Sequence, residues 1–252
     1  MKTFSEYKNT SKNLSIKESV DSQYTLFPKD KKELKQMIKE EIKKQGYKAD
    51  LNHIDVSKIT DFSELFYYSE FNGDISKWNV SNVTDMSYTF SNSKFGGDIS
   101  DWDVSNVIDM SHMFFNNHAF NQDLSGWDVS NVTNMSSMFC AAEFFNGDVS
   151  TWDVRNVVNM SSMFRLSGFV GNLKLWNTKN VKDMSSMFHY CGNFNSDISR
   201  WNVSNVTNMR CMFYDCEKFN QNISKWDVSN VENVRDMFTN CPCPKEYRPK
   251  FK

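Results

Sequence analysis

All seven tryptophans of the chain recur at a nearly constant interval. They are Trp78, Trp102, Trp127, Trp152, Trp176, Trp201 and Trp226, so neighbouring tryptophans are always 24 or 25 residues apart. A period in this range is typical of a solenoid, in which each unit is too small to bury its own apolar face and packs on its neighbours. The spacing therefore predicts a stack of similar coils.

The residues around each tryptophan repeat as well. Aligned on Trp, the template has Val two and five residues later, Met eight later and Met-Phe at eleven and twelve: Trp127, Val129, Val132, Met135, Met138 and Phe139. A second Phe follows after five or six residues and the next Trp after seven more, so all length variation falls in one loop. The pattern begins at Ile54 and ends at Phe238, which predicts about eight coils with one exposed, length-tolerant corner.

The residues before the repeats have a different composition. Residues 1–50 hold twelve Lys against eight Asp plus Glu, whereas the chain as a whole has a net charge of −2. The segment 30–44 places Leu34, Met37, Ile38 and Ile42 on one helical face, and Gly46 is a stop signal. We expect residues 24–50 to form a helical cap on the first coil, with a membrane-surface helix as the alternative.

The ends of the chain complete the predicted domain organisation. We expect a mobile segment over residues 1–23, the cap over 24–50, the repeats over 51–240 and a tail over 241–252. No apolar run follows Met1, and no stretch approaches eighteen apolar residues, so we expect neither a signal peptide nor a membrane span. Cytoplasmic location and export by another route both stay open.

The repeat itself resembles a known family. Residues 127–139, WDVSNVTNMSSMF, followed by FNGDVS at 145–150, resemble the repeat of bacterial BspA-like surface proteins, which is widespread in mycoplasmas. The resemblance covers residues 51 to about 240, and the basic segment before them resembles the leader that precedes such repeats. It implies a leucine-rich-repeat-like coil, a role in surface binding or adhesion, and no assigned activity for most members.

The spacing of apolar residues fits that implied fold. Ile75-x-x-Trp78-x-Val80 has the spacing of L-x-x-L-x-L, in which a short central strand points alternate side chains inward. We therefore predict an α/β repeat solenoid: a leucine-rich-repeat-like, right-handed coil with short parallel strands centred on the Trp-Asp/Asn-Val segments and an N-terminal helical cap. Cys191, Cys216 and Cys241 share one template position, and we expect buried free thiols there, with an oxidised pair as the alternative.

Three polar columns accompany the tryptophans. An Asn stands four residues after every Trp, and we assign this column to the fold, as an amide ladder. Four residues before the Trp lies an acidic column: Asp74, Asp98, Asp123, Asp148 and Asp197. Turn capping explains this column, and a calcium stripe is the alternative. One residue after the Trp lies an Asp or Asn, including Asp103, Asp128 and Asp153, which predicts an acidic outer face.

Several function classes find no support in the sequence. No phosphate-cradling glycine motif or nucleophile elbow occurs, and the four His share no template position, so we expect no enzyme and no cofactor. Residues 51–240 carry thirteen Lys plus Arg against twenty-two Asp plus Glu, which disfavours nucleic acid as a partner. We expect a monomeric, non-catalytic module for protein interaction or adhesion, with a calcium-binding structural or adhesive array as the alternative.

One stretch of the repeats departs from the template at outward positions. Arg155, Lys174 and Lys179 replace Ser or other neutral residues, and the apolar Leu175 lies beside them. The Trp, Met and Phe positions are retained there, so the changes alter surface charge without altering the core. We predict a basic spot with one apolar residue inside the acidic face as the place where a protein partner docks.

Overall fold

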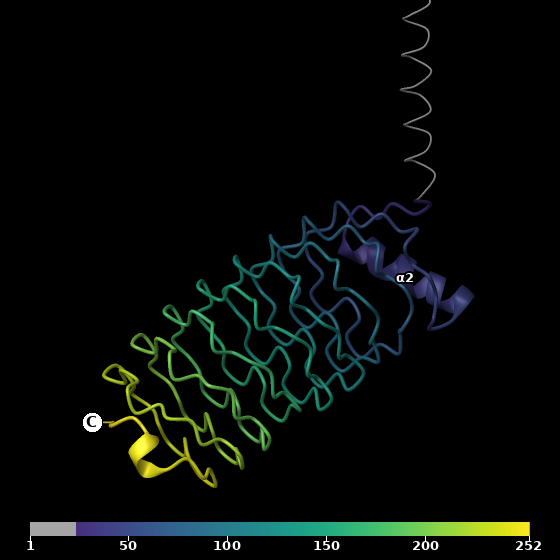
Figure 1. Cartoon of the computed structure of the whole chain (residues 1–252). Coiled ribbons are helices and arrows are strands. Elements are labelled where there is room, and N and C mark those ends of the chain that lie inside the picture. The colour runs from purple at the N-terminus through teal and green to yellow at the C-terminus, as the bar shows by residue number, and fades with distance from the viewer. Residues whose placement is uncertain (1–23, 252) are drawn as a thin grey trace, which may run out of the picture.

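The computed structural model describes residues 24–251. They form an elongated stack of coils with an α-helix, α2 (Lys31–Gln45), at the N-terminal end and a short 3-10 helix, η1 (Lys245–Tyr247), near the other end (Figure 1). Our expectation of a mobile segment over residues 1–23 lies outside the described residues. We call each turn of the stack a coil.

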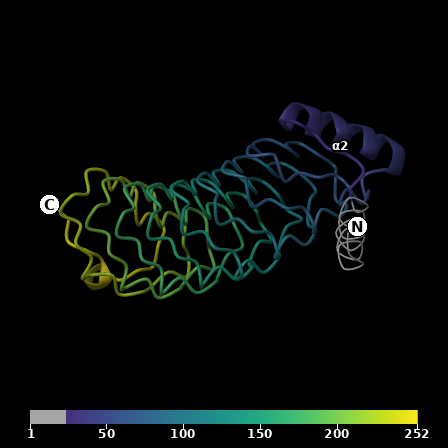
Figure 2. The same ribbon diagram turned by 90° about the horizontal axis from the view of Figure 1, so that it is seen from above.

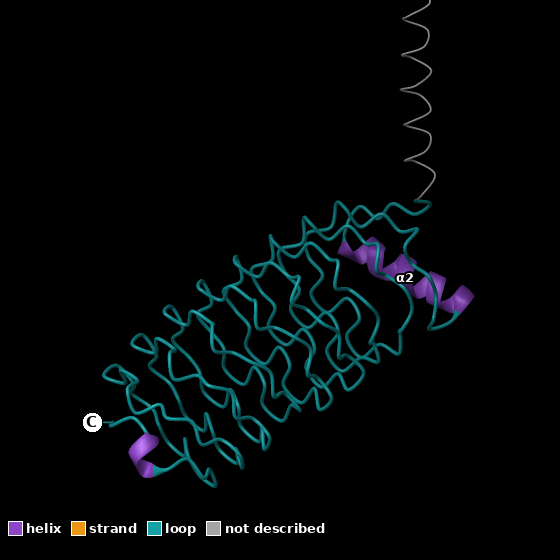
Figure 3. Cartoon of the chain, viewed as in Figure 1, coloured by secondary structure: helices purple, strands orange, loops and turns teal. Residues whose placement is uncertain are grey.

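The predicted α/β, leucine-rich-repeat-like class is wrong. The described residues contain no β-strand, and the coils are loop along their whole length (Figure 3). Successive coils meet instead at isolated parallel bridges: Asp61, Asp85, Asp109, Asn134, Asn159, Asp183, Asn208 and Asn233. These residues lie seven after each Trp position, so the parallel strands that we predicted at the Trp-Asp/Asn-Val segments are absent among the described residues.

Tight turns occupy the place of the predicted strands. The N–H of Trp78 donates to the carbonyl of Ile75, and the N–H of Val83 donates to that of Val80, so the chain reverses twice around each Trp. Asp74 and Asn79 start these turns, because the side-chain oxygen of each accepts the N–H two residues later. Apolar residues two apart point inward from such turns as they do from a strand, which is why the spacing misled the prediction.

Backbone hydrogen bonds join the coils along one segment. In the second coil Met86, Tyr88, Phe90 and Asn92 donate their N–H groups to carbonyls of the third coil at 2.7 to 2.9 Å. The residues between them close i to i+3 turns within the coil, as Thr89 does on Met86. The same arrangement recurs at every junction between neighbouring coils. We call these donors the donor row of a coil.

Two residues of every donor row have a left-handed backbone, although neither is glycine. They have φ between 52° and 61° and are Glu64, Tyr68, Tyr88, Asn92, His112, Asn116, Ser137, Ala141, Ser162, Leu166, Ser186, Tyr190, Cys211, Asp215, Asp236 and Asn240. This conformation costs a residue with a Cβ about 1–2 kcal/mol. In every coil but the last, the N–H of each of these residues donates to a carbonyl of the next coil; within residues 24–251, Asp236 and Asn240 have the same conformation without that bond.

Replacing Ala141 by Gly is expected to stabilise the protein. The left-handed conformation, φ 57°, costs Ala more than the entropic penalty of about 0.5–1 kcal/mol that Gly brings to the unfolded chain. Chemical denaturation of Ala141→Gly should therefore show a higher midpoint. The matched control is Ala142→Gly, because Ala142 is fully buried and its φ is not positive, and this variant should be less stable than the parent. A lower midpoint for Ala141→Gly would contradict the assigned backbone.

The tryptophans form a column inside the stack, as predicted. Each indole Nε1–H donates to a carbonyl of the preceding coil at 2.9 to 3.2 Å. Trp152 is 3% exposed, and its ring lies parallel to those of Trp127 and Trp176 at 6.5 and 6.3 Å. The two Phe positions stack beside this column, for example Phe139 on Phe145 at 3.8 Å. Aromatic burial thus holds neighbouring coils together.

The helix predicted from the apolar stripe is present and packs on the stack. Asp30 caps α2 by accepting the N–H of Glu33, and Gly46, with φ 85°, follows its last residue. Leu34 and Ile38 are buried in the same apolar cluster as the first coil. Lys31 Nζ lies 2.9 Å from the carboxylate of Asp61. Figure 2 shows α2 lying along the N-terminal end of the stack.

All six cysteines are free, buried thiols. Cys191 and Cys216 each donate to a Phe carbonyl of the preceding coil, at 2.7 and 2.8 Å. Burial raises the pKa of Cys191 to about 12 and also raises that of Cys216. The cysteine column therefore serves the packing of the coils, and the structure shows no oxidised pair among the described residues.

Candidate functional site

The Asn column contributes to the fold. The side-chain Nδ2 of each member donates to a backbone carbonyl one coil earlier at 2.6 to 2.8 Å; the members are Asn82, Asn106, Asn131, Asn156, Asn180, Asn205 and Asn230. Each amide thus ties two coils together at the surface. A ladder of this kind leaves these side chains little freedom to change partners.

The acidic column four before the Trp caps turns. In each member one carboxylate oxygen accepts the backbone N–H of the Ser two positions later, and the members are Asp74, Asp98, Asp123, Asp148 and Asp197. Hydrogen bonds from Ser76 hold the pKa of Asp74 below its usual range. Within residues 24–251 no group of three or more His, Cys, Asp or Glu side chains is placed to hold a metal ion. The structure therefore offers no observation that favours the calcium stripe.

The outer acidic residues are also turn residues. Asp103, Asp128 and Asp153 each accept the backbone N–H two residues later, at 3.0 to 3.2 Å. Asp103 and Asp128 are exposed, and Asp153 is partly buried. All three carboxylates therefore close turns, and the second oxygen of Asp153 pairs with Arg155. The acidic outer face stays a prediction.

Two of the three cations of the predicted basic spot form ion pairs with nearby carboxylates. Arg155 Nε lies 2.7 Å from a carboxylate oxygen of Asp153, and Lys174 Nζ lies 3.0 Å from Asp197 of the next coil. The side chains of Ser199 and Lys174 lower the pKa of Asp197 to about 2. Leu175 is 80% exposed. Half-exposed pairs of this kind contribute little stability and leave less positive charge for a partner than the sequence suggests.

Lys179 extends the spot into the following coil. It is exposed, and its backbone N–H donates to the side-chain oxygen of Asn177, which caps the turn. Lys179 and Arg155 occupy the same template position in neighbouring coils, and Asn180 donates to the carbonyl of Arg155. The structure thus places Arg155 and Lys179 on one side of adjacent coils. The hydrogen bond from Arg155 and the charge of Lys179 both lower the pKa of the Asp153 carboxyl.

A second surface, which the sequence analysis did not identify, lies at the length-variable corner of the coils. We call it the corner groove; it is lined by His118, Ala141, Glu143, Phe144, Leu166, Ser167, Gly168, Tyr190, Gly192 and Asn193. These residues come from four successive coils, at the loop between the two Phe positions of the template. None of them belongs to the basic spot.

Large apolar side chains stand exposed in the corner groove. Phe144 is 61% exposed, Tyr190 48% and Leu166 40%. Leu166 and Tyr190 are left-handed members of their donor rows, so hydrogen bonds to the next coil fix their backbones. The groove therefore presents apolar groups from a rigid frame. A contiguous apolar surface rimmed by polar residues is typical of an interaction site.

Polar groups border this apolar surface. His118 lies 3.7 Å from the carboxylate of Glu143, and its ring meets that of Phe144 edge-on at 6.4 Å. The nearby carboxylate of Asp215 raises the pKa of the Tyr190 phenol above its usual range. The sequence gives one signal for this site, namely that the loop between the two Phe positions of the template varies in length.

Comparison with known proteins places the repeats in a family. Residues 32–143, 70–168 and 165–246 match the family described as Mycoplasma protein of unknown function, DUF285. The three matches together span most of the chain. The chain belongs to this family. A mycoplasma-type repeat is therefore shown, whereas nothing in the match points to the BspA-like proteins in particular.

The DUF285 match includes all four coils of the corner groove and the basic spot. No curated protein and no solved structure matches the chain. Neither helix of the described residues is long and apolar enough to cross a membrane. The family description assigns no activity, so the surface of the stack is the remaining source of evidence on function.

Proposed function

We propose that this DUF285 repeat protein is a non-catalytic module that binds another protein through the corner groove. The exposure of Phe144, Leu166 and Tyr190 on one rigid surface is the observation that carries the proposal. The resemblance of the repeat to BspA-like surface proteins supports a role of this kind, adhesion included.

The physical properties of the groove favour a protein partner. Exposed aromatic side chains supply large contact areas and dominate the energetics of protein interfaces, and the surrounding polar groups supply hydrogen bonds at the rim. Phe144 and Tyr190 fit the first role, and Glu143 and Asn193 fit the second. Because stacked coils hold the groove in place, binding requires little ordering of this surface.

Site-specific photo-cross-linking tests the proposal. A photoreactive amino acid at position 144 or 190 is expected to give protein adducts in a lysate of the source cell or its host. The substitution Leu166→Ser, between the two positions, should reduce both adducts. Position 108 is the matched control, because Ile108 is an exposed apolar residue, 50% exposed, outside the groove. Adducts that form equally at 108, or that survive Leu166→Ser, would contradict the assignment.

A cross-linker at position 175 tests the basic spot as the alternative surface. If Leu175 gives the specific adducts and positions 144 and 190 give none, the partner docks on the basic spot. In that case Arg155→Glu, Lys174→Glu and Lys179→Glu together should weaken capture in a salt-dependent way. If the corner groove is the site, this triple variant should capture the partner as well as the parent does.

A further inference from the structure

One side of α2 is a row of lysines. They follow one another at intervals of three or four residues, so their side chains share one side of the helix, and all are exposed: Lys32, Lys35, Lys39 and Lys43. Lys31 extends the row towards the first coil, where its Nζ contacts Asp61. A hollow on this side is lined by Lys31, Lys32, Lys35, Gln36 and Lys39. We call Lys32, Lys35, Lys39 and Lys43 the lysine face.

The positive charge of the lysine face is not paired within residues 24–251. No ion pair joins any of its four lysines to a carboxylate of the described residues. Glu33 and Glu40 lie on another side of the helix. Burial and the charge of Lys31 lower the pKa of Lys35, and carboxylates of the first coil offset this only in part. An anion at this face would therefore relieve repulsion between like charges.

The helix is held in place while the lysine face stays open to solvent. Leu34 and Ile38 fix α2 by their burial against the first coil. Figure 2 shows α2 on the outside of the stack at its N-terminal end, with the coils running away from it. An exposed aromatic residue lies near each end of the helix, Phe27 before it and Tyr47 after it. Lysines accompanied by aromatic residues are typical of segments that lie on anionic lipid surfaces.

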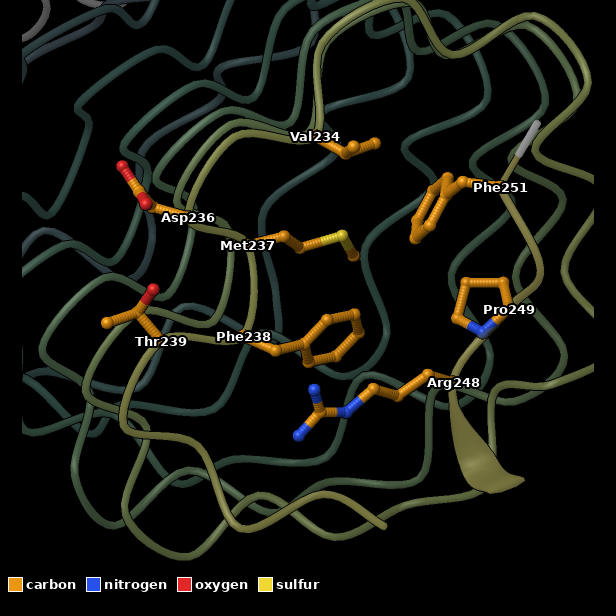
Figure 4. Close-up of a pocket in the computed structure, with 8 residues that line it drawn as sticks. All are labelled: Val234, Asp236, Met237, Phe238, Thr239, Arg248, Pro249 and Phe251. Carbon is orange, nitrogen blue, oxygen red and sulfur yellow. The ribbon is translucent and has the colours of Figure 1, made fainter. Parts of the chain in front are cut away.

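The hollow at the C-terminal end of the described residues differs in charge. Figure 4 shows Arg248 beside Phe238 in that hollow. The guanidinium lies 4.6 Å from the centre of the Phe238 ring and donates to the carbonyls of Cys241 and Cys243. This cation is thus engaged within the chain, in contrast to the lysine face.

Two other occupants suit the lysine face less well than a lipid surface does. Residues 1–23 carry four Lys against three Asp plus Glu, so they bring no net negative charge. A nucleic acid that extended beyond α2 would meet residues 51–240, where thirteen Lys plus Arg stand against twenty-two Asp plus Glu and repel phosphates. The face also contains no Arg, whose planar fork suits a defined carboxylate or phosphate, whereas the hydrated point charge of Lys suits a diffuse anionic surface.

We propose that the lysine face of α2 holds the N-terminal end of the protein against the anionic headgroups of a lipid bilayer. The helix lies flat on the headgroups without leaving the stack, because Leu34 and Ile38 stay buried in the apolar cluster of the first coil. The repeats, with their excess of acidic residues, extend away from the bilayer and leave the corner groove open to its partner.

Cosedimentation of the full chain with lipid vesicles tests this proposal. The chain is expected to sediment with vesicles of phosphatidylcholine and phosphatidylglycerol in about equal amounts, and not with vesicles of phosphatidylcholine alone. Lys32→Gln, Lys39→Gln and Lys43→Gln together should raise the lipid concentration for half-maximal binding about a hundredfold, since each lysine strengthens such binding about fivefold. Gln keeps the helix propensity of Lys, and thermal denaturation checks that the variant stays folded.

The matched control removes the same charge from the repeats. Lys94, Lys218 and Lys225 are exposed there, and the variant with Gln at all three positions should bind the anionic vesicles as the parent does. The proposal is overturned if the parent does not sediment with the anionic vesicles, or if vesicles without anionic lipid bind it equally well. A control variant that loses as much binding as the helix variant would also overturn it.

Acetylation of lysines, followed by mass spectrometry, locates the contact. When about nine tenths of the chain is bound to anionic vesicles, acetylation of the lysine face should slow about tenfold, while that of the three control lysines stays unchanged. Equal slowing at both sets would contradict the assigned face. A DNA duplex that binds the parent, when anionic vesicles do not, would assign the face to nucleic acid instead.

A variant of the corner groove separates the two proposals. Phe144→Ser alters that groove and should leave vesicle binding intact. Loss of vesicle binding in this variant would assign the lipid contact to the corner groove and overturn the role of the lysine face. Failure of the lysine face to bind lipid would leave the expected cross-links at positions 144 and 190 unaffected.

Discussion

Replacing Trp152 by Ala is expected to lower the free energy of unfolding by about 3–5 kcal/mol. The ring is 3% exposed and stacks between Trp127 and Trp176, so its removal leaves a cavity at the centre of the column. The change also removes the hydrogen bond from Nε1 to the carbonyl of Leu124, at 2.9 Å, and leaves that buried carbonyl without this donor. Both losses act on the junction between two coils.

Equilibrium denaturation in urea, followed by circular dichroism, measures this effect. Leu175→Ala is the matched control, since it truncates a large apolar side chain that is 80% exposed, and it should change stability by less than about 0.5 kcal/mol. A Trp152→Ala variant as stable as this control would show that the tryptophan column does not hold the coils together.

The second large effect is expected at the N-terminal end. Leu34→Ala should destabilise the protein by about 2–5 kcal/mol, because Leu34 of α2 is fully buried in the apolar cluster that continues into the first coil. Gln36→Ala is the control, since Gln36 is exposed and its side-chain amide donates to Glu40 on the same helix. Both variants are compared by thermal denaturation.

The residues whose hydrogen exchange rises in the Leu34→Ala variant distinguish two roles for α2. If the helix closes the stack, Leu34→Ala should raise hydrogen exchange first in the amides of Phe62, Glu64 and Phe66, which belong to the first coil. Exchange that rises only inside α2, together with an unchanged denaturation midpoint, would mean that the stack does not depend on the helix.

Much of the interior follows from the sequence. The Trp, Val, Met and Phe positions that share a template offset are buried, for example Trp127, Val132 and Phe139. The apolar stripe of residues 30–44 predicted α2, where Asp30 and Gly46 supply the end signals. The buried positions can be predicted from the sequence because they recur once in every coil.

The backbone path could not be predicted in the same way. Side chains two apart, such as Trp78 and Val80, face the core both from a strand and from a pair of turns, so the pattern does not distinguish the two. Left-handed backbone positions are usually occupied by Gly, whereas here Tyr88 and Leu166 have this conformation while donating their N–H groups to the next coil. The residue type at these two positions therefore does not reveal the left-handed conformation, which is seen only when the coils are stacked.

Which side chains meet at the surface depends on the register between neighbouring coils. Lys174 appeared as part of a basic spot because its partner, Asp197, belongs to the following coil. Phe144, in the length-variable loop, gave no signal of exposure, since its position relative to Leu166 and Tyr190 follows from how three loops stack.

The register between coils fixes both the core and the corner groove, and anomalous scattering from selenomethionine crystals measures it. The buried template Met should give two rows of selenium peaks: Met86, Met110, Met135, Met160, Met184 and Met209 in one, and Met113, Met138, Met163, Met187, Met212 and Met237 in the other. Within each row, neighbouring peaks should lie about 5 Å apart, the separation that coil-to-coil backbone hydrogen bonds impose. Peaks that form no rows, or rows in another residue order, would contradict the stack and the corner groove built on it.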